Sequence, residues 1–451
     1  MTQADDVASV PIVIAEKGTL AEARPPDGGP PNSGTYSLSG RGLYVVVLLL
    51  IVNIFNFVDR QLPFILIGSI KAELLLTDSQ IGLMAGLAFA IVYSFASLPL
   101  AHIADRWSPR WVLSLSLATW SGMTALSGLA GNFIQLVLAR IGVAGSEAGC
   151  TPSAHSLISR LIVPNRRALA LALFSLGVPI GSMFGLMLGG WINDVANWRT
   201  AFFVVGLPGL IIAIICWWTL PALPPNRVAH VAPTPFFATL RYLFKLRSFR
   251  YMAAASSLYA CGSYAINVFA PAFLMRVHGL SSSQAGLRMG IVFGVGGLIG
   301  TFAGGVLGDW LGRRDEAWRQ IVPAIGQWLS LPTALAAWLV PDVTLSVVFL
   351  TLSYMFGLLY FAPTFAAAQS LVRDEIRATT SAALLFCLTL VGSSVGPMVV
   401  GWLSDALMPR FGALSLRYAL CSSVVTIALS ACCFHLAGRS LADDLRANSG
   451  R

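Results

Sequence analysis

The chain repeats one unit about twelve times, an apolar run of about 20 residues followed by a short polar turn. A helix of that length crosses about 30 Å of hydrocarbon, so each run is predicted to be a membrane-spanning helix. The composition agrees, because 56% of the residues are apolar, 11% are charged and the mean hydropathy is +0.75. No soluble core buries so large an apolar fraction. We therefore predict an all-α integral membrane protein.

The predicted helices fall into two groups of six. The first six runs begin near Leu43, Ile81, Trp111, Phe133, Ala168 and Ala201, and the second six begin near Tyr251, Gly286, Ile321, Thr344, Thr379 and Tyr418. Equivalent runs of the two groups end alike. These ends are Ala104-Asp105-Arg106-Trp107 with Gly308-Asp309-Trp310-Leu311-Gly312-Arg313-Arg314, and Gly190-Trp191-Ile192-Asn193-Asp194 with Gly401-Trp402-Leu403-Ser404-Asp405. Parallel repeats of this kind predict two six-helix bundles related by a pseudo-two-fold axis.

The distribution of Lys and Arg predicts the side that each loop faces. With a cytoplasmic N-terminus, most of the 29 Lys and Arg residues fall on the inner side, where membrane proteins retain positive charge. The outer side receives only Lys71, Arg199, Arg276, Arg288, Arg410 and Arg417. We therefore expect both termini in the cytoplasm. The basic residues are spread over short loops, so the net charge of +9 reflects topology and no nucleic-acid partner is expected.

Five segments are expected along the chain. Residues 1–41 are predicted to form a disordered cytoplasmic tail and no signal peptide, residues 42–220 and 251–438 the two bundles, and residues 439–451 a second cytoplasmic tail. The linker 221–250 carries Phe236, Phe237, Leu240, Leu243 and Phe244 at helical spacing opposite basic residues. This pattern favours an amphipathic helix on the inner leaflet, and the alternative is a loose linker whose apolar residues touch the bundle.

Four charged residues interrupt the apolar runs of the first half: Asp59 and Arg60 in the first run, and Arg140 and Glu147 in the fourth. A charge at the bilayer centre costs about 2.5–3.5 kcal/mol on insertion scales, so such residues line a polar pathway or neutralise one another. On an ideal helix Arg140 and Glu147 point within about 20° of each other, whereas Asp59 and Arg60 diverge by about 100°. One member of the second pair can face a cavity while the other pairs sideways.

Small residues recur every four positions in the fifth run, at Gly177, Gly181, Gly185 and Gly189, and the eleventh run repeats part of the pattern with Gly392 and Gly396. Such a stripe lets another helix approach closely. The recurrence beside proline in both halves favours an interface that moves over one that is only tightly packed.

The repeated halves, the acid and Arg loops and the run Arg140-Ile141-Gly142-Val143-Ala144-Gly145 resemble the major facilitator superfamily over residues 42–440. The loop motif is degraded in the first half, where Ser108 and Pro109 stand at positions at which Gly is typical, and is more complete in the second. The resemblance implies a twelve-helix secondary transporter of the major facilitator fold.

Three stretches resemble the spinster-like subfamily more narrowly, whose animal members export sphingolipid or lysolipid species. They are Phe57-Val58-Asp59-Arg60, then Arg140 through Gly149, and Asn197-Trp198-Arg199-Thr200-Ala201-Phe202-Phe203 followed by Gly206-Leu207-Pro208-Gly209. The resemblance implies an amphipathic, lipid-like substrate and a bacterial-type member in the inner membrane. The alternatives are a transporter of a small organic anion or drug, a lipid sensor that does not transport, and a scramblase.

The charged residues are then expected to couple protons to transport. Glu147, and with it Asp59, is expected to lose and gain a proton as the site opens alternately, while Arg60 or Arg140 holds a phosphate or carboxylate. A static network that only neutralises the charges is the alternative. In the second half we expect a neutral, aromatic-lined side for an apolar tail, with Tyr264, Asn267, Tyr360 and Thr364 as binding residues, although aromatic residues often merely pack.

The basic and acidic loop residues are expected to form a cytoplasmic gate that holds the inner face closed when the outside is open. This set consists of Asp105, Arg106, Arg110, Asp309, Arg313 and Arg314. Charge placed for topology alone is the alternative.

The sequence argues against other functional classes. The five His form no metal-like cluster, no nucleophile elbow or Ser-x-x-Lys pair is present, and no phosphate-binding Gly-rich loop precedes a Lys. The seven Cys lie in or beside apolar runs and are expected to be free thiols. We therefore expect a monomeric, non-enzymatic transporter without metal or cofactor, driven by a proton gradient or by the substrate's own gradient.

Overall fold

The computed structural model describes residues 36–223, 236–373 and 376–449. These residues are helical almost throughout, and the β-pairing among them is an isolated bridge between Tyr36 and Ile162. Nine described stretches have the length and hydropathy of a membrane span. The last of them, Thr379–Arg446, contains two crossings, and α4 and α14 complete a set of twelve.

The first half contains six crossings, three of which are built from more than one helical segment. In chain order they are α1 (Arg41–Leu74); α2 (Asp78–Gly82), η1 (Leu83–Ala88) and α3 (Phe89–Arg106); α4 (Pro109–Ser127); α5 (Phe133–Glu147) and α6 (Cys150–Leu161); α7 (Pro164–Ser175) and α8 (Gly177–Val195); and α9 (Trp198–Thr219).

The second half repeats this order after the short helix α10 (Phe236–Leu243). Its crossings are α11 (Arg247–His278); α12 (Ser282–Ile291), η2 (Val292–Gly296) and α13 (Gly297–Gly312); α14 (Trp318–Leu339); α15 (Val343–Gly357), η3 (Leu358–Tyr360) and α16 (Phe361–Ser370); α17 (Arg377–Cys387), η5 (Leu388–Gly392) and α18 (Ser393–Phe411); and, after η6 (Gly412–Leu414), α19 (Ser415–Leu420) and α20 (Ser422–Ser449). Each crossing starts within four residues of its predicted start, and the twelve-helix prediction is confirmed.

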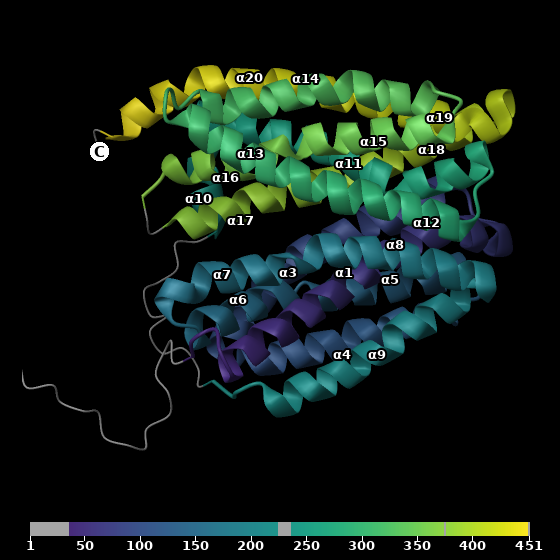
Figure 1. Cartoon of the computed structure of the whole chain (residues 1–451), viewed down its shortest axis with the longest axis horizontal. Coiled ribbons are helices and arrows are strands. Elements are labelled where there is room, and N and C mark those ends of the chain that lie inside the picture. Colours follow the sequence, from purple (N-terminus) through teal and green to yellow (C-terminus); the bar gives the residue numbers. More distant parts are fainter. Residues whose placement is uncertain (1–35, 224–235, 374–375, 450–451) are drawn as a thin grey trace, which may run out of the picture.

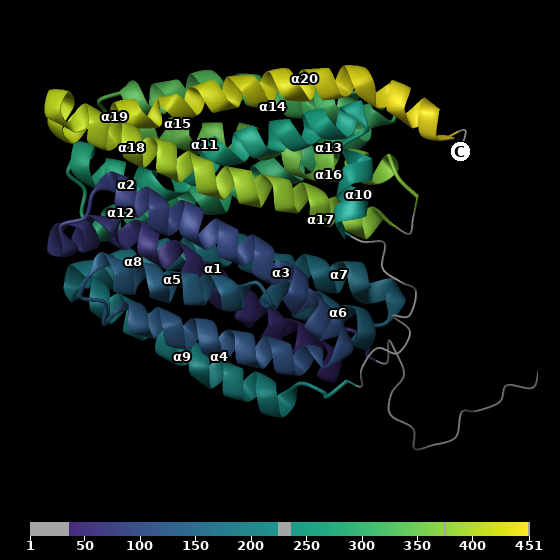
Figure 2. The ribbon, with the colours of Figure 1, turned by 180° about the vertical axis from the view of Figure 1, so that it is seen from behind.

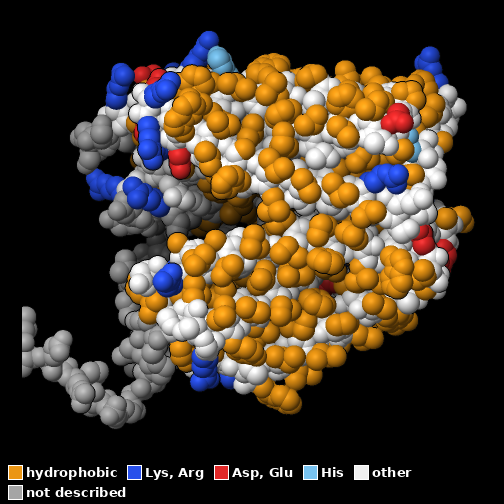
Figure 3. All heavy atoms as spheres, in the orientation of Figure 1, with side chains coloured by type: hydrophobic (Ala, Val, Ile, Leu, Met, Phe, Trp, Pro, Cys, Tyr) orange, Lys and Arg blue, Asp and Glu red, His pale blue; other side chains and the backbone are white. Residues whose placement is uncertain are grey.

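The two halves lie side by side, with the first half in purple to teal and the second in green to yellow (Figure 1). The first described crossing, α1, begins and the last, α20, ends at the same end of the bundle, which we call the tail end. The opposite end, where α1 ends and α2 begins, is the distal end (Figures 1 and 2). On the face shown in Figure 3, hydrophobic side chains dominate the surface between the two ends, as lipid contact requires.

The halves meet most closely toward the distal end. There α8 of the first half packs along α12 of the second, and α2 packs along α18, so the two contacts are related by the internal repeat. At the tail end the space-filled molecule is hollowed between the halves (Figure 3). The molecule is therefore joined at one end and open at the other.

The glycine stripe of α8 packs against α1 within the same half. A Cβ added at Gly181 would approach Phe57 Cβ to 2.7 Å, and one at Gly185 would approach Val58 Cα and O to 2.9 Å. In the other half, added Cβ atoms at Gly392 and Gly396 would meet α11 at Ala260 and Cys261. The stripe therefore joins neighbouring helices of one bundle, and movement along it stays a prediction.

Substituting Gly185 by Ala is expected to lower thermal stability, because its Cβ would press on backbone atoms of Val58 that cannot turn aside. Such overpacking typically costs about 1–3 kcal/mol. Gly122→Ala in α4 is the matched control, since no atom lies within 4 Å of its added Cβ. Melting of the purified proteins in detergent tests this, and equal melting temperatures for the two variants would contradict the packing.

The segment boundaries expected from composition fall close to helix ends. The crossing α11 begins at Arg247, inside the expected linker 221–250, and α20 continues through the expected tail to Ser449. Residues 1–35, most of the expected tail, lie outside the described residues. The expected amphipathic helix exists as α10, where Leu243 is buried in a cluster with residues of α11 and α17 while Arg241 is exposed. Its apolar face thus contacts the bundle.

Candidate functional site

The four membrane-embedded charges of the first half lie together between α1 and α5. The guanidinium of Arg60 donates to one carboxylate oxygen of Glu147, with Nη2 at 2.9 Å and Nε at 3.2 Å from Oε2. Arg140, Asp59 and Glu147 interact electrostatically as well. The network holds two acids and two arginines, so it is neutral as a whole when all four are ionised.

Aromatic rings surround the exposed side of this network. The guanidinium carbon of Arg60 lies 4.6 Å from the ring centre of Tyr93 and 5.2 Å from those of Phe57 and Phe89. The guanidinium carbon of Arg140 lies 5.4 Å from the centre of the same Phe89 ring. Ring faces attract cations, and this attraction is stronger where water is excluded. The rings therefore hold both guanidinium groups in place without using their hydrogen-bond donors.

The Asp59 side of the network is fully enclosed. Asp59 is 1% exposed and Arg140 is 2% exposed, whereas the side chain of Arg60 retains 15%. Among the described residues, neither carboxylate oxygen of Asp59 nor Nε and Nη1 of Arg140 has a hydrogen-bond partner. Trp120 and Thr124 of α4 lie beside Asp59 without a hydrogen bond of ordinary geometry. The carboxylate of Asp59 can therefore still bind a proton, and the two nitrogens of Arg140 can still donate to a polar ligand.

The ion pair between Arg60 and Glu147 can be broken either by a proton on Glu147 or by an anion on Arg60. Its Oε2 is held by Arg60, while Oε1 is buried and has no partner among the described residues. A buried carboxylate is stable when it is paired with a cation or protonated. If Glu147 takes up a proton, Arg60 is released to bind an anion, and if Arg60 binds an anion, Glu147 favours a proton. The proton thus takes the place of Arg60 on Glu147, and the substrate anion takes the place of Glu147 on Arg60, so each event favours the other.

Two of the binding residues expected in the second half lie near this network. Asn267 of α11 accepts a hydrogen bond of 3.5 Å from Gln61 of α1, which joins the halves beside Arg60. Tyr264, one turn earlier on α11, is half-buried and interacts electrostatically with Arg60 and Tyr93. The neighbourhood of Arg60 is therefore shared by both halves.

The other two expected binding residues are packed inside the second half. Tyr360 is 3% exposed, and its ring centre lies 5.0 Å from that of Tyr259. Thr364 is fully buried and donates a 3.5 Å hydrogen bond to Gln320 of α14. In this conformation these two side chains support the bundle.

The expected gate residues lie at the tail end. Arg110 donates to the backbone oxygen of Leu220 at 3.1 Å and so holds the end of α9. Asp309, Arg313 and Arg314 are exposed, and Arg314 lies 5.1 Å from the ring centre of Trp310. The side chains of Asp105 and Arg106 lie outside the described residues.

A second polar cluster, at the distal end, was not selected from the sequence. Asp78 at the start of α2 is fully buried, and its carboxylate binds Arg276 of α11 through two hydrogen bonds of 2.7 Å and Lys71 of α1 at 2.6 Å. Lys71 and Arg276 were recognised only as outer-side charges. The ending Gly401 to Asp405 lies beside this cluster, and its repetition at Gly190 to Asp194 was the sequence signal that could have led to it.

No group of three or more potential metal ligands occurs among the described residues, and the seven cysteines are free thiols.

The sequence is similar to a known protein family and to several of its members. A family model described as Major Facilitator Superfamily matches residues 49–397. An "MFS-type efflux pump" of Mycolicibacterium smegmatis is 37% identical over 409 residues, covering 90% of this chain and 94% of that protein. "Protein spinster homolog 3" of Danio rerio is 25% identical over 403 residues, 85% of this chain and 81% of the relative.

Among solved structures, a bacterial homologue of the human lysosomal transporter Spinster matches with a TM-score of 0.82 and 28% identity. The match covers 90% of this chain and 98% of that one, whose structure is described as inward-facing and unoccupied. The resemblance to spinster-like proteins is therefore confirmed by sequence and by structure.

Proposed function

Since the chain belongs to the Major Facilitator Superfamily and is therefore a membrane transporter and not an enzyme, we propose that it moves an amphipathic, lipid-like substrate by proton-coupled alternating access. The observation that carries the proposal is the Arg60–Glu147 ion pair, buried between α1 and α5 with one carboxylate oxygen unpartnered among the described residues. That pair offers one position for an anion, at Arg60, and one for a proton, at Glu147, and occupancy of either breaks the ion pair and so favours occupancy of the other.

The shape of the molecule supports alternating access. The halves are joined at the distal end and separated by a hollow at the tail end (Figure 3), and the related Spinster homologue is described as inward-facing. We assign the tail end to the cytoplasm, following the distribution of Lys and Arg, and the membrane to the bacterial inner membrane. Rocking of the halves about Arg60 would then expose the site to the other side.

The lipid-like substrate is supported by the asymmetry of the site. The first half supplies Arg60 and Glu147, whereas the facing surface of the second half supplies the neutral side chains of Tyr264 and Asn267. A molecule with a charged head and an apolar tail matches such a division. A relative of Xenopus tropicalis named "Sphingosine-1-phosphate transporter SPNS2", 24% identical over 426 residues, agrees with this substrate class, and the relative named as an efflux pump agrees with outward movement.

A small organic anion or drug is the second candidate. It is favoured by the enclosed charges of Asp59 and Arg140 and by the efflux pump among the relatives, because a compact anion needs only the first-half network. A lipid sensor would use the same site without net flux. In each case the protein acts as a monomer and needs no cofactor beyond the ion gradient.

Transport in proteoliposomes distinguishes these functions. We expect a labelled lysophospholipid to cross, and unlabelled lysophospholipid or a phosphorylated sphingoid base to compete with it, while soluble carboxylates do not. Competition by carboxylates alone would replace the lipid with a small anion. Binding without flux would indicate a sensor, and equal movement in both directions without effect of a pH gradient would indicate a scramblase.

A further inference from the structure

The distal end of α8 carries a carboxylate that caps a helix of the other half. Asp194 Oδ1 accepts from the backbone N–H of Ser282 at 3.1 Å, and its Oδ2 accepts from the N–H and the hydroxyl of Ser283 at 2.9 and 2.6 Å. These residues begin α12, which belongs to the second half. The first N–H groups of a helix lack partners within the helix, and a negative charge is stabilised there.

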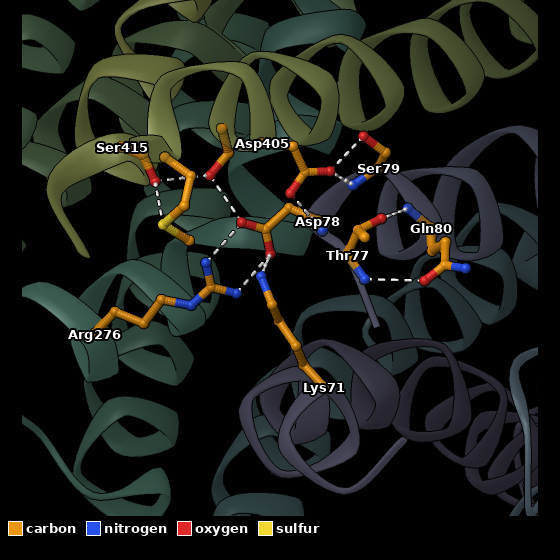
Figure 4. A network of polar contacts seen from close by, with 10 residues as sticks. Lys71, Thr77, Asp78, Ser79, Gln80, Arg276, Asp405 and Ser415 are labelled. Atoms are coloured by element: carbon orange, nitrogen blue, oxygen red, sulfur yellow. Dashed lines mark hydrogen bonds and ion pairs between the residues drawn. The ribbon is translucent and has the colours of Figure 1, made fainter. Parts of the chain in front are cut away.

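The same contact occurs at the equivalent position of the repeat. Asp405 of α18 accepts from the backbone N–H of Asp78 at 3.0 Å and from the N–H and the hydroxyl of Ser79 at 2.7 and 2.5 Å (Figure 4). Asp78 begins the helix that runs through α2 and η1 into α3, a span of 27 residues from Asp78 to Ala104. Here a second-half carboxylate caps a first-half helix.

Each carboxylate stands one turn after a glycine that permits the approach. A Cβ added at Gly190 would strike the backbone oxygen of Ser282, and one added at Gly401 would strike that of Asp78. The approaching helices are alike too, because Thr77 and Ser281 each form a capping box with the Gln three residues later. The repeated endings Gly190 to Asp194 and Gly401 to Asp405 are thus both explained by one contact.

A second row of polar side chains lies behind each cap. Asn193 donates to Ser282 Oγ and to Ser69 Oγ, both at 2.8 Å. At the equivalent place, Ser404 donates to Asp78 at 2.8 Å, and Asp78 also binds Lys71 and Arg276 (Figure 4). Both rows cross between the halves, so the bonds at each cap are made only while the distal end is joined.

We propose that Asp194 and Asp405 form a paired latch, in which each carboxylate holds the distal end shut by capping a membrane helix of the opposite half. The proposal rests on alternating access, since it assigns the two caps to the state that is open at the tail end. Opening the distal end separates α8 from α12 and α2 from α18, and therefore breaks all six bonds to the two carboxylates. Because both caps join the same two halves, the movement that opens one cap also opens the other. Weakening either cap should therefore expose the starts of both α2 and α12.

Amide hydrogen exchange of the full-length protein in detergent, read by mass spectrometry, tests the latch. Hydrogen bonds to a charged group contribute about 1.5–3 kcal/mol, so Asp405→Asn is expected to speed exchange on the order of tenfold at the start of α2. The same variant is expected to speed exchange at the start of α12, which Asp405 does not touch. Asp194→Asn is expected to give the reciprocal result, and Ser283→Ala is the milder substitute if that variant does not fold.

Asp342→Asn is the matched control, because Asp342 caps α15 at the same end by accepting from Leu345 N–H at 2.8 Å within one half. It should leave α2 and α12 unchanged. Faster exchange confined to the helix whose cap was removed, or unchanged exchange, would overturn the latch. The assay contains no substrate and no gradient, so a failure of the lipid or proton assignment would leave its result intact.

Discussion

Glu147→Gln is expected to abolish net transport driven by a proton gradient while exchange of substrate across the membrane persists. The Gln side chain keeps the shape and one oxygen for Arg60, but it carries no charge and binds no proton. The ion pair of 2.9 Å is thereby lost, and with it the link between proton uptake at Glu147 and anion binding at Arg60. A carrier without this link still equilibrates substrate but gains nothing from a gradient.

The measurement compares two fluxes of labelled lysophospholipid in proteoliposomes. Gradient-driven net flux should fall to the level of protein-free liposomes, and exchange against unlabelled substrate should remain. Glu73→Gln is the matched control, because Glu73 also pairs with an arginine, Arg199 at 2.7 Å, but lies exposed at the end of α1. Proton-driven flux that survives in Glu147→Gln would remove Glu147 as the coupling acid.

Arg140→Gln is expected to destabilise the protein strongly, and Asp59→Asn is expected to restore most of that loss. Arg140 is the enclosed cation of the network, so its removal leaves Asp59 and Glu147 with only Arg60. Breaking a buried pair by removing one partner typically costs about 3–5 kcal/mol, because the remaining charge has no compensation. Neutralising Asp59 returns the network to one acid and one arginine.

Thermal melting of the two single variants and the double variant in detergent gives the interaction free energy between Asp59 and Arg140. Glu316→Gln is the control, since it removes a partly exposed pair with Arg319 at 3.2 Å and should cost no more than about 1 kcal/mol. If Arg140→Gln does not fold, recovery of folded protein in the double variant supplies the same comparison. Additive losses in the double variant would show that Asp59 and Arg140 do not balance each other.

Helix number, repeat and family were predictable because they depend on run length and on repeated short motifs. The apolar runs placed all twelve crossings, and the three stretches that contain Asp59, Arg140 and Trp198 together indicated the spinster-like relatives. The grouping of Asp59, Arg60, Arg140 and Glu147 was also predictable, since charges inside a membrane must compensate one another.

The spacing of residues along a helix did not predict which neighbouring helix each of its faces contacts. The α8 stripe from Gly177 to Gly189 packs on α1 of its own bundle, and only the packed structure shows which face meets which neighbour. Tyr360 and Thr364 share their residue types with binding groups, but their helix turns them into the bundle. The carboxylate caps of Asp194 and Asp405 join residues far apart in sequence, so the repeated endings indicated symmetry without revealing the contact.

We expect a proton gradient to drive net movement of an amphiphile through the site at Arg60 and Glu147. The most direct test is the net flux of a labelled lysophospholipid through the wild-type protein in proteoliposomes, measured with and without an imposed pH gradient. Net flux should be faster with the gradient and should reverse its direction when the gradient is reversed. Equal net flux with and without the gradient, or no flux under any gradient, would contradict this expectation.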